Sequence, residues 1–416
     1  VMRVVAVLCL LALACTVEAG TTRRVYIAAD EVEWDYAVRG DYYEVDRYIE
    51  YRVDAPVFLE PSPDRIGKVY TKAIYREYTD ATFTTLAPRP RDMEHLGLLG
   101  PTVWAEVGDI VELHFKNNAR FEFSVHPHGV YYTKDAEGAK YPDNALPAGD
   151  AIPPGETYTY IWPIPARAGP GPGDRSSRLW LYHGHVDEVI ATNVALMGCL
   201  VVTSKGMAFP DGKPKDVDRE IFLVANIFNE NVSPFLDLNM ETHLTTDQDF
   251  EELKEDEDFQ ESNLLHALNG YVYNNVPGLF MDQGDRVRWY IGGLGTDVDL
   301  HTFKWHGASV ADHGVRESSV RIIASETTEV DMIADRVGQW ILHCSVNDHI
   351  AAGMEALYTV RAADLYNSFN YETLSDKLYG GDDDDDDSAG LVTSSSASAL
   401  SVGVALLVLS LSYTIV

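Results

Sequence analysis

The sequence predicts an all-β protein built from two antiparallel β-sandwich domains. Short alternating apolar runs broken by Gly, Pro, Asn and Asp turns recur along the chain, and few helical periodicities compete with them. We expect strands at 110–115, 158–162, 286–291 and 328–332. A length of 416 residues with 46% apolar content supports two cores, since a domain typically holds about 100–200 residues.

An internal duplication divides the chain into two similar halves. Three segments of the first half recur in the same order in the second half, and each pair combines a strand-like run with a turn or a histidine. The pairs are GDIV (108–111) with GDRV (284–287), VHPHG (125–129) with FKWHG (303–307), and LYHGH (181–185) with LHCS (342–345). Three ordered matches indicate two copies of one domain.

Composition sets the domain boundaries. We place the first domain at residues 20–205 and the second at 216–363, joined across 204–215, which is rich in Gly, Pro and Lys. Residues 364–388 are predicted to form an acidic stalk. The acidic stretch 247–261 is predicted to be a solvated loop.

Both ends have the pattern of processing signals. In residues 1–19, Arg3 precedes an apolar run and a small-residue cleavage site, which predicts a secretory signal peptide. Near the other end, the small residues 388–390 precede a mostly polar spacer (391–398) and an apolar tail (399–416). This is the order of a glycosylphosphatidylinositol (GPI) anchor signal, which predicts residues 389–416 as that signal and Ser388 as the attachment site. A single transmembrane helix is the alternative. We therefore expect an extracellular protein at the cell surface, attached to the membrane by a lipid anchor.

The net charge of −33 argues against nucleic acid as a partner and would concentrate metal cations near the surface. Cys9 and Cys15 leave with the signal peptide, so the mature chain keeps Cys199 and Cys344 and has no disulfide framework. Cys199 lies in an apolar run and is predicted to be a buried strand residue. Asn231 begins a possible glycosylation motif, weakened by the proline that follows it.

The segment 343–354 (HCSVNDHIAAGM) is the most informative one chemically. Cys344, His349 and Met354 have the C-x4-H-x4-M spacing of a blue copper centre, and His301 lies upstream as a fourth ligand. Two imidazoles, a thiolate and a weak thioether suit a one-electron copper couple. Core histidines and a buried thiol would explain one or two of these residues, but not all four at this spacing.

The chain resembles the multicopper oxidases, in particular the ceruloplasmin and hephaestin ferroxidase family. The first half carries HPHGVYYTKDAEGAKYPDN and LYHGHVDE, and the second half carries HTFKWHG and HCSVNDHIAAGME. The resemblance covers residues 22–362 and implies two cupredoxin-like Greek-key sandwiches. It implies that His301, Cys344, His349 and Met354 hold a type 1 copper in the second domain only, because Gly184 replaces the cysteine in the first.

The resemblance also implies a trinuclear copper cluster that reduces O2 to water. In the family this cluster is built from four His-x-His pairs, and six of the eight histidines are present here. His126 would bind the type 2 copper, and the type 3 coppers would take the remaining five, which are His128, His183, His185, His306 and His343.

Two cluster positions depart from the family pattern. Lys304 replaces a histidine of the type 2 copper, and Ser345 replaces one of a type 3 copper. A lysine ammonium has no lone pair to offer a metal. These two replacements predict an incomplete cluster, with less than full oxidase activity as the consequence.

The same family holds Fe(II) beside the type 1 copper, and this chain has matching residues. Glu261, His266 and Asp348 match that iron site, and Asp297 matches a further carboxylate position. Hard carboxylate oxygens favour Fe(III) over Fe(II), which makes electron loss by iron easier. The resemblance thus implies a ferroxidase, with laccase-like oxidation of organic reductants as the alternative enzyme.

The first domain resembles the first cupredoxin domain of these ferroxidases, and the second resembles their last, with no domain between them. The resemblance therefore implies a homotrimer that shares its clusters between protomers. The opposing hypothesis is not an enzyme: a cupredoxin protein with one blue copper that binds copper or transfers electrons. The sequence leaves this choice open, and it also leaves open a calcium site beside the loop 134–144.

Overall fold

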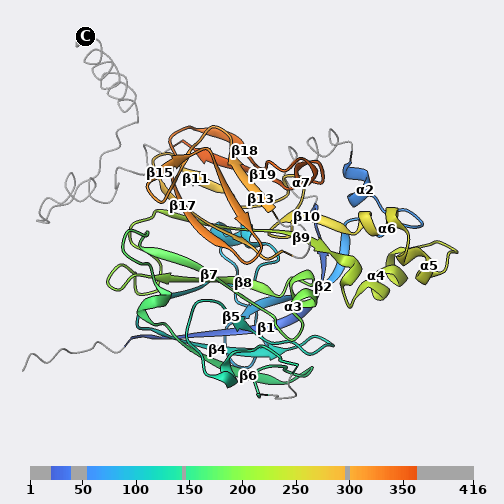
Figure 1. Ribbon diagram of the computed structural model, residues 1–416, viewed down its shortest axis with the longest axis horizontal. Coiled ribbons are helices and arrows are strands. Elements are labelled where there is room, and N and C mark those ends of the chain that lie inside the picture. The colour runs from blue at the N-terminus through green and yellow to red at the C-terminus, as the bar shows by residue number, and fades with distance from the viewer. Residues whose placement is uncertain (1–19, 39–53, 143–146, 296–299, 363–416) are drawn as a thin grey trace, which may run out of the picture. The chain divides into compact units, whose positions relative to one another are not determined.

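The computed structural model describes residues 20–38, 54–142, 147–295 and 300–362. Within these ranges strands dominate and form four β-sheets stacked face to face (Figure 1). The predicted all-β class is confirmed. The predicted signal peptide, stalk and anchor signal lie outside the described residues, as do Ser388 and Asp297. Among the described residues, no helix has both the length and the apolar character needed to span a membrane.

The first sandwich consists of two four-stranded sheets. One has the strand order β2-β1-β4-β6 and the other β3-β8-β7-β5. A buried core that includes Val111, Phe115, Trp162 and Leu200 lies between them. The strands are β1 (Thr22–Asp35), β2 (Val69–Tyr78), β3 (Val103–Glu106), β4 (Ile110–Asn117), β5 (His126–Pro127), β6 (Thr157–Pro163), β7 (Ser177–His183) and β8 (Met197–Thr203).

The second sandwich follows with the sheet orders β10-β9-β12-β17-β14-β15 and β11-β19-β18-β13-β16. Its core includes Trp289, Phe303, Leu342 and Tyr358. The strands are β9 (Arg219–Asn229), β10 (Leu264–Leu268), β11 (Phe280–Asp282), β12 (Arg286–Gly293), β13 (Leu300–Trp305), β14 (Val310–Asp312), β15 (Val315–Glu317), β16 (Ser319–Ile323), β17 (Thr327–Ile333), β18 (Gly338–Cys344) and β19 (Glu355–Arg361).

The two sandwiches repeat the same pairing. β1 runs parallel to β4 and β9 runs parallel to β12, while β3 with β8 and β11 with β19 form the matching parallel pairs. The repeated Gly-Asp turns also agree: Gly108 has φ 102° and Gly284 has φ 101°, values that favour glycine. Asp109 and Asp285 each accept a hydrogen bond from the backbone amide three residues earlier. The duplicated motifs therefore occupy equivalent places.

A third apolar layer joins the sandwiches. Leu181 on β7 and Cys199 on β8 share one buried cluster with Phe222 on β9 and Tyr290 on β12. Polar contacts cross the same boundary, since the Leu179 amide donates to Glu329 Oε1 at 2.5 Å. The sheets containing β7 and β9 thus form the two inner layers of a four-layer stack (Figure 1).

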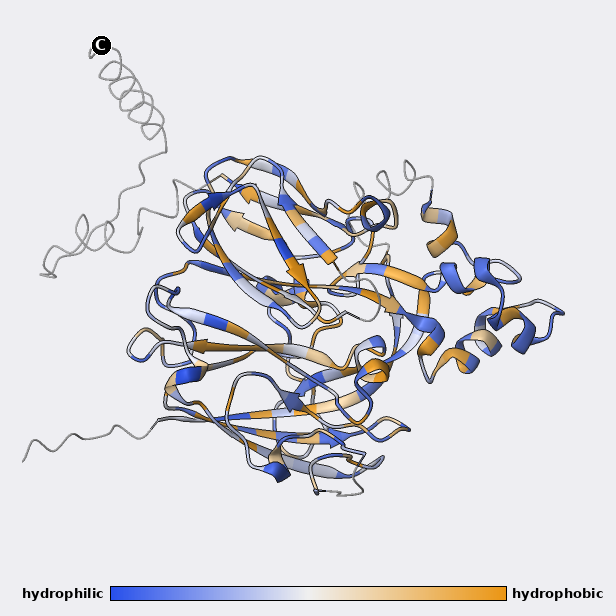
Figure 2. Cartoon of the chain, viewed as in Figure 1, coloured by the Kyte–Doolittle hydropathy of each residue, from blue (hydrophilic) through white to orange (hydrophobic). Residues whose placement is uncertain are grey.

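Helices are short and lie at the margins. The predicted loop at 247–261 is wrong, because α5 and α6 form there. Asp249 and Asp256 cap their first turns, and Leu253 and Phe259 are buried beneath them. Most residues of this region are nevertheless hydrophilic (Figure 2). The helices are α2 (Ala55–Leu59), α3 (Glu188–Asn193), α4 (Leu236–His243), α5 (Phe250–Lys254), α6 (Glu257–Ser262) and α7 (Asn347–Ala351), with 3-10 turns η1 (Arg91–Leu96), η2 (Lys134–Ala136), η3 (Ala166–Ala168) and η4 (Glu230–Val232).

Candidate metal centre

Strands β13 and β18 position the chemistry of the second sandwich. Successive side chains of a strand point to opposite faces of the sheet. Cys344 pairs with Phe303 and is buried toward the core, whereas His343 pairs with Lys304, which is exposed on the other face. One dipeptide therefore directs a thiol inward and an imidazole outward.

The thiol meets two imidazoles in the core. Cys344 Sγ lies 4.0 Å from His301 Nδ1 and 3.6 Å from His349 Nδ1. All three side chains are buried, and their ligand atoms lie within 4.8 Å of one another. His301 comes from β13 and His349 from α7, the short helix that follows β18.

Met354 completes this group from the turn before β19. Its side chain is fully buried in the same core cluster as Cys344. The Cys344 amide donates to the Met354 carbonyl at 3.0 Å, and the Met354 amide donates to the His349 carbonyl at 2.8 Å. These backbone bonds hold the C-x4-H-x4-M segment in a compact loop around the thiol.

The four residues fit a type 1 copper. A trigonal metal with bonds of about 2.3 Å to sulfur and about 2.0 Å to nitrogen would separate those atoms by about 3.7 Å, close to both sulfur–nitrogen distances here. Burial raises the pKa of the Cys344 thiol, but the contacts with His301 and His349 and the 3.5 Å hydrogen bond from the Thr302 amide outweigh it and lower the pKa to about 6. The thiolate that a metal requires is thus favoured near neutral pH.

His266 lies against this group from outside. Its ring centroid is 5.1 Å from that of His349, in an edge-to-face arrangement, and its side chain is 8% exposed. Asp348 precedes His349 on α7, and Glu261 is near the end of α6; both are exposed. In the described chain the structure brings His266 to the predicted copper site, but the ligand atoms of Glu261, His266 and Asp348 do not converge as those around Cys344 do.

Four histidines gather at one end of the first sandwich. His128 Nε2 and His183 Nε2 lie 3.0 Å apart, and the His126 and His185 ring centroids lie 5.0 Å apart. The Nδ1 atoms of His126 and His183 donate to the carbonyls of Glu137 and Gly184, at 2.7 and 3.0 Å. Such bonds leave Nε2 as the lone-pair atom, as expected for a metal ligand.

Burial favours the neutral form of three of these imidazoles. Burial and the neighbouring histidines together lower the pKa of both His128 and His183 to about 4. Burial also lowers the pKa of His126. Neutral imidazole is the form that binds metal, so this quartet fits the predicted half of a copper cluster.

A second, smaller half lies on the outer face of the second sandwich. His306 Nε2 and His343 Nε2 are 3.1 Å apart, and His343 Nδ1 donates to the Cys344 carbonyl at 2.8 Å. Lys304 and Ser345 are exposed beside them, and the Ser345 amide donates to Thr302 O at 2.8 Å. Burial, His343 and Lys304 together lower the pKa of His306.

One chain does not join the two halves. His306 and His343 belong to the outermost sheet, on the face away from its core, whereas the quartet lies on the sheet containing β5 and β7. The sheet containing β9, β12 and β17 lies between (Figure 1), and stacked sheets are about 10 Å apart. No hydrogen bond or ring contact connects the two groups within the described ranges.

The first sandwich has no room for its own type 1 site. A Cβ atom on Gly184 would approach Ala191 Cβ to 2.8 Å and Leu196 Cβ to 3.5 Å. The space is already filled by α3 and the turn after it. Cys199 is fully buried on β8, and burial raises the pKa of its thiol to about 12, which agrees with the predicted inert role.

Sequence reasoning missed Asp150. Its side chain is fully buried next to the loop 134–142. Among the described residues neither carboxylate oxygen has a hydrogen bond of good geometry, and the nearby Ala139 backbone amide is the one donor that lowers its pKa. Burial raises the pKa of this carboxyl. No motif marked Asp150 in the sequence, but an unpartnered buried carboxylate is the kind of group that a cation stabilises, which bears on the open question of calcium.

Asn231 is a poor glycan acceptor in this fold. Its side-chain nitrogen donates to Asn229 Oδ1 and to the Gln260 carbonyl, both at 2.9 Å, and its oxygen accepts from Asn263. A glycan would have to replace these bonds. Glycosylation at Asn231 therefore stays a prediction that the geometry does not favour.

The stacked sandwiches and the buried Cys-His-His-Met group define a copper protein of the cupredoxin type. Multicopper oxidase family models match residues 95–206 and 239–364. The chain belongs to the multicopper oxidase family, and this membership implies copper as the cofactor.

Curated relatives narrow the comparison. The chain is 42% identical to human hephaestin, 38% identical to rat ceruloplasmin and 38% identical to human Ferroxidase HEPHL1. These matches cover 80%, 81% and 82% of the present chain, respectively. It spans only 28%, 32% and 29% of those proteins, about three tenths of their length.

Solved structures agree on the fold alone. A copper nitrite reductase from Nitrosomonas europaea gives a TM-score of 0.51 at 17% identity, covering 82% of this chain and 94% of that one. The multicopper oxidase mgLAC gives 0.53 at 17% identity, covering 85% and 95%.

Proposed function

We propose that this protein is a cell-surface ferroxidase, which oxidises Fe(II) to Fe(III) and reduces O2 to water. The observation that carries the proposal is the buried convergence of His301, Cys344 and His349, with His266 packed against His349. The similarity to hephaestin, ceruloplasmin and a protein named a ferroxidase supports iron as the substrate.

The chain's residues would divide the work as follows. When bound, copper would supply the one-electron couple at the type 1 site and the electrons for oxygen reduction at the cluster. Cys344 and His343 are adjacent in β18 and face opposite sides of the sheet, so the backbone between them links the two sites by covalent bonds. The hydrophobic core around Met354 keeps water from the thiolate.

Iron would bind outside this core. Glu261 and Asp348 are exposed carboxylates, and His266 supplies an imidazole in contact with His349. Hard oxygen ligands stabilise Fe(III) relative to Fe(II), which would make electron transfer toward His349 favourable. The net charge of −33 would attract the cation to this surface. Asp297 would add a further carboxylate.

The oxygen-reducing cluster would form between copies of the chain. The histidine quartet of one protomer would meet His306 and His343 of the next, and a closed cyclic homotrimer would satisfy every half-site. The separation of the halves within one chain supports this arrangement. His126 would then hold the type 2 copper, and the type 3 coppers would lie at the two Nε2 pairs, with His185 as the remaining ligand.

A second candidate function rests on Lys304 and Ser345. Both are exposed at the smaller half-site, where the family pattern places two more imidazoles. A cluster short of two ligands would leave a protein with one blue copper that binds copper or transfers electrons. Laccase-like oxidation of organic reductants is the third candidate, and the acidic surroundings of the copper site disfavour it.

Attachment to the membrane is also part of the proposal. A signal peptide at residues 1–19 would direct secretion, and a GPI anchor at Ser388 would hold the protein outside the cell. Treatment of intact cells with a phosphatidylinositol-specific phospholipase should release the protein into the medium. Retention on the cells after that treatment would indicate a transmembrane tail instead.

Copper content and oxygen uptake test the enzyme proposal on the purified full chain. We expect four coppers per chain by elemental analysis, and O2 consumption when Fe(II) is added. A single copper per chain without O2 consumption would exclude the ferroxidase and favour the electron-transfer protein.

A paired substitution tests iron as the substrate. Glu261→Gln with Asp348→Asn removes two negative charges outside the copper site, so we expect KM for Fe(II) to rise about tenfold or more with the visible copper–thiolate absorption unchanged. Oxidation of an organic diamine should keep its rate. The matched control, Glu255→Gln with Glu257→Gln, lies in the same acidic segment and should leave KM for Fe(II) near that of the unmodified protein. Equal losses with iron and the diamine would contradict an iron site at these residues.

A further inference from the structure

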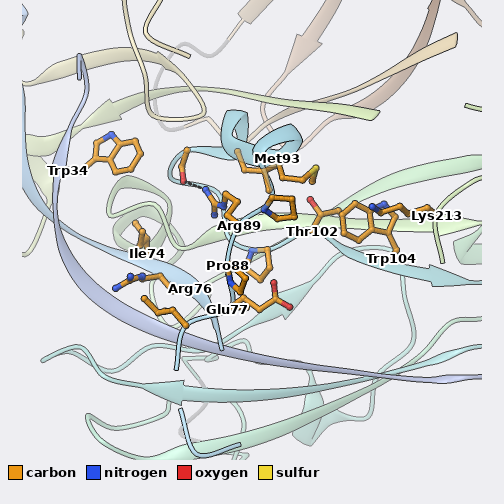
Figure 3. Close-up of a pocket in the computed structure, with 16 residues that line it drawn as sticks. Trp34, Ile74, Arg76, Glu77, Pro88, Arg89, Met93, Thr102, Trp104 and Lys213 are labelled. Atoms are coloured by element: carbon orange, nitrogen blue, oxygen red, sulfur yellow. Dashed lines mark hydrogen bonds between the residues drawn. The ribbon is translucent and has the colours of Figure 1, made fainter. Parts of the chain in front are cut away.

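A cavity lies on the first sandwich, and none of the residues that line it is a predicted metal ligand. Its volume is about 570 Å³, within the range of about 300–1,000 Å³ typical of small-molecule sites. Strand β2, the turn η1 and the start of β3 form its walls, and Lys213 closes one side from the segment between the sandwiches (Figure 3).

The walls are apolar and include two indoles. Trp34 and Trp104 line the cavity, together with Met93, Leu96 and several prolines. Both indole N–H groups are already satisfied: Trp34 donates to the Gly270 carbonyl at 2.7 Å and Trp104 donates to Glu220 Oε1 at 3.2 Å. The rings are therefore fixed by bonds behind the cavity and offer flat apolar surface to a ligand.

The charged groups of the cavity are mostly cationic. Arg76, Arg89 and Lys213 line it against one carboxylate, Glu77, in a chain whose net charge is −33. Arg89 donates through Nη1 and Nη2 to the carbonyls of Gly97 and Leu99, at 2.7 and 2.8 Å. Those bonds orient its guanidinium, and the nearby Glu77 carboxylate offsets part of its positive charge.

Lys213 is the cation best placed for a ligand. Its Nζ lies 4.7 Å from the centroid of the Trp104 ring. In the part of the chain that the structure describes it forms no ion pair within 4.0 Å, and its nearest acidic influence is the Glu220 carboxyl behind Trp104, whose pKa it lowers. Arg76, by contrast, lies 3.6 Å from Asp30. Positive charge and an aromatic face thus occur side by side at one end of the cavity (Figure 3).

Thr102 supplies an unused polar group at the same end. Its side chain is only 8% exposed, and Oγ1 has no hydrogen-bond partner among the described residues. A buried hydroxyl without a partner destabilises the fold, and a ligand that accepts its hydrogen bond removes this cost. Thr102 and Lys213 both flank Trp104 in Figure 3, so one acceptor group could engage both of them.

We propose that this cavity binds a small carboxylate that carries an aromatic ring. The carboxylate accepts a hydrogen bond from Thr102 Oγ1 and pairs with Lys213, while the ring packs against the indole and proline walls. Arg89 adds positive potential at longer range. The site is separate from the proposed copper and iron chemistry, and it stands on the cavity residues alone.

Calorimetric titration of the purified full chain with naphthoate tests the proposal, with naphthamide as the uncharged analogue. We expect saturable binding of naphthoate and at least about tenfold weaker binding of naphthamide, because a hydrogen bond and an ion pair to a carboxylate are lost. Lys213→Gln and Thr102→Val should each weaken naphthoate binding about five- to tenfold. Since the Thr102 hydroxyl has no partner, valine should not lower the melting temperature.

Lys215→Gln is the matched control, because Lys215 lies two residues from Lys213 but does not line the cavity. It should bind naphthoate like the unmodified chain. Absence of naphthoate binding at millimolar concentration would overturn the proposal, as would equal affinity for naphthamide. Unchanged affinity in both cavity variants would overturn it too.

Discussion

The two sandwiches share one strand pairing but differ in what they keep from a common pattern. The first has the complete quartet of His126, His128, His183 and His185, and Ala191 fills the space where a thiol would stand at Gly184. The second has the buried thiol of Cys344 and only two outward histidines. Each sandwich therefore lacks what the other holds, and a complete oxidase requires both.

The two cysteines make the same contrast at the level of one atom. Both are fully buried on a strand of their sandwich. Burial alone raises the pKa of the Cys199 thiol to about 12, whereas contacts with His301 and His349 overcome burial and lower that of Cys344 to about 6. The main difference lies in the hydrogen-bond partners of the sulfur, which Cys344 has and which are not among the causes of the Cys199 shift.

Removal of each thiol is the strongest test of this contrast. Cys344→Ser should abolish the visible copper–thiolate absorption and Fe(II) oxidation, because oxygen cannot replace the soft sulfur ligand. Cys199→Ala should keep both and lower stability by about 1 kcal/mol, as a small core truncation does. Absorption spectra and O2 uptake of the two variants measure this directly. Surviving absorption in Cys344→Ser would place the copper elsewhere.

Mixing two inactive chains tests whether the sandwiches of different copies cooperate. His128→Ala disables the quartet and His343→Ala disables the smaller half-site, so each variant alone should lose nearly all O2 consumption. Co-assembled chains should recover about a quarter of the activity, because one interface in four then pairs two intact half-sites in a cyclic trimer.

The recovery depends on the subunits exchanging. Folded variants mixed at neutral pH without dissociation serve as the control and should remain inactive. A monomeric mass in light scattering, or no recovery after co-expression, would contradict a cluster shared between protomers.

Introducing the two missing imidazoles tests the smaller half-site of the second sandwich. Lys304→His with Ser345→His should hold the cluster copper more tightly against a chelator, at the same four coppers per chain, and increase Fe(II)-dependent O2 uptake about tenfold, the scale on which ligand environment changes metal affinity. Elemental analysis after dialysis against the chelator and oxygen measurements give both values. The paired control Lys304→Gln with Ser345→Ala removes the charge and the hydroxyl without adding ligands. Equal behaviour of the two double variants would show that six histidines suffice.

Local patterns in the sequence predicted much of this structure. The four expected strands lie within β4, β6, β12 and β17, because period-two alternation reflects a sheet with one buried face. That His349 and Met354 would gather around Cys344 was also predictable, since they come from one short segment whose backbone closes around the sulfur.

Features that depend on distant contacts were not predictable. The acidic segment 247–261 forms helices because Leu253 and Phe259 find a core to pack against. The isolation of Asp150, the cavity beside Thr102 and the distance between the cluster halves all arise from the stacking of sheets. A sequence pattern predicts individual strands, whereas these properties depend on how whole sheets pack against one another.

The boundary between the sandwiches holds the last and smallest test. Glu220 lies on β9 and accepts a hydrogen bond from Trp104 of the first sandwich. Burial raises the pKa of its carboxyl to about 7, although contacts with Trp104, Tyr290 and Lys213 lower it. The boundary between the sandwiches therefore favours the protonated form of Glu220 relative to its form in the unfolded chain.

The pH dependence of unfolding should reveal this carboxyl. Because the folded pKa of Glu220 is raised, the unfolded chain loses this proton first. The stability that Glu220 contributes is therefore fully present below about pH 4.5 and is lost as the pH rises to about 7. Glu220→Gln removes the charge and keeps a hydrogen-bond acceptor, so it should stabilise the protein by about 1–3 kcal/mol at pH 8 and by little at pH 4.5. Denaturant unfolding at both pH values measures the effect, and Glu106→Gln, another glutamate at the edge of the first sandwich, serves as the control. If the sandwiches unfold as one unit, Glu220→Gln should shift a single unfolding transition that includes both. Two transitions, of which only one shifts, would mean that the boundary containing Glu220 does not couple the sandwiches.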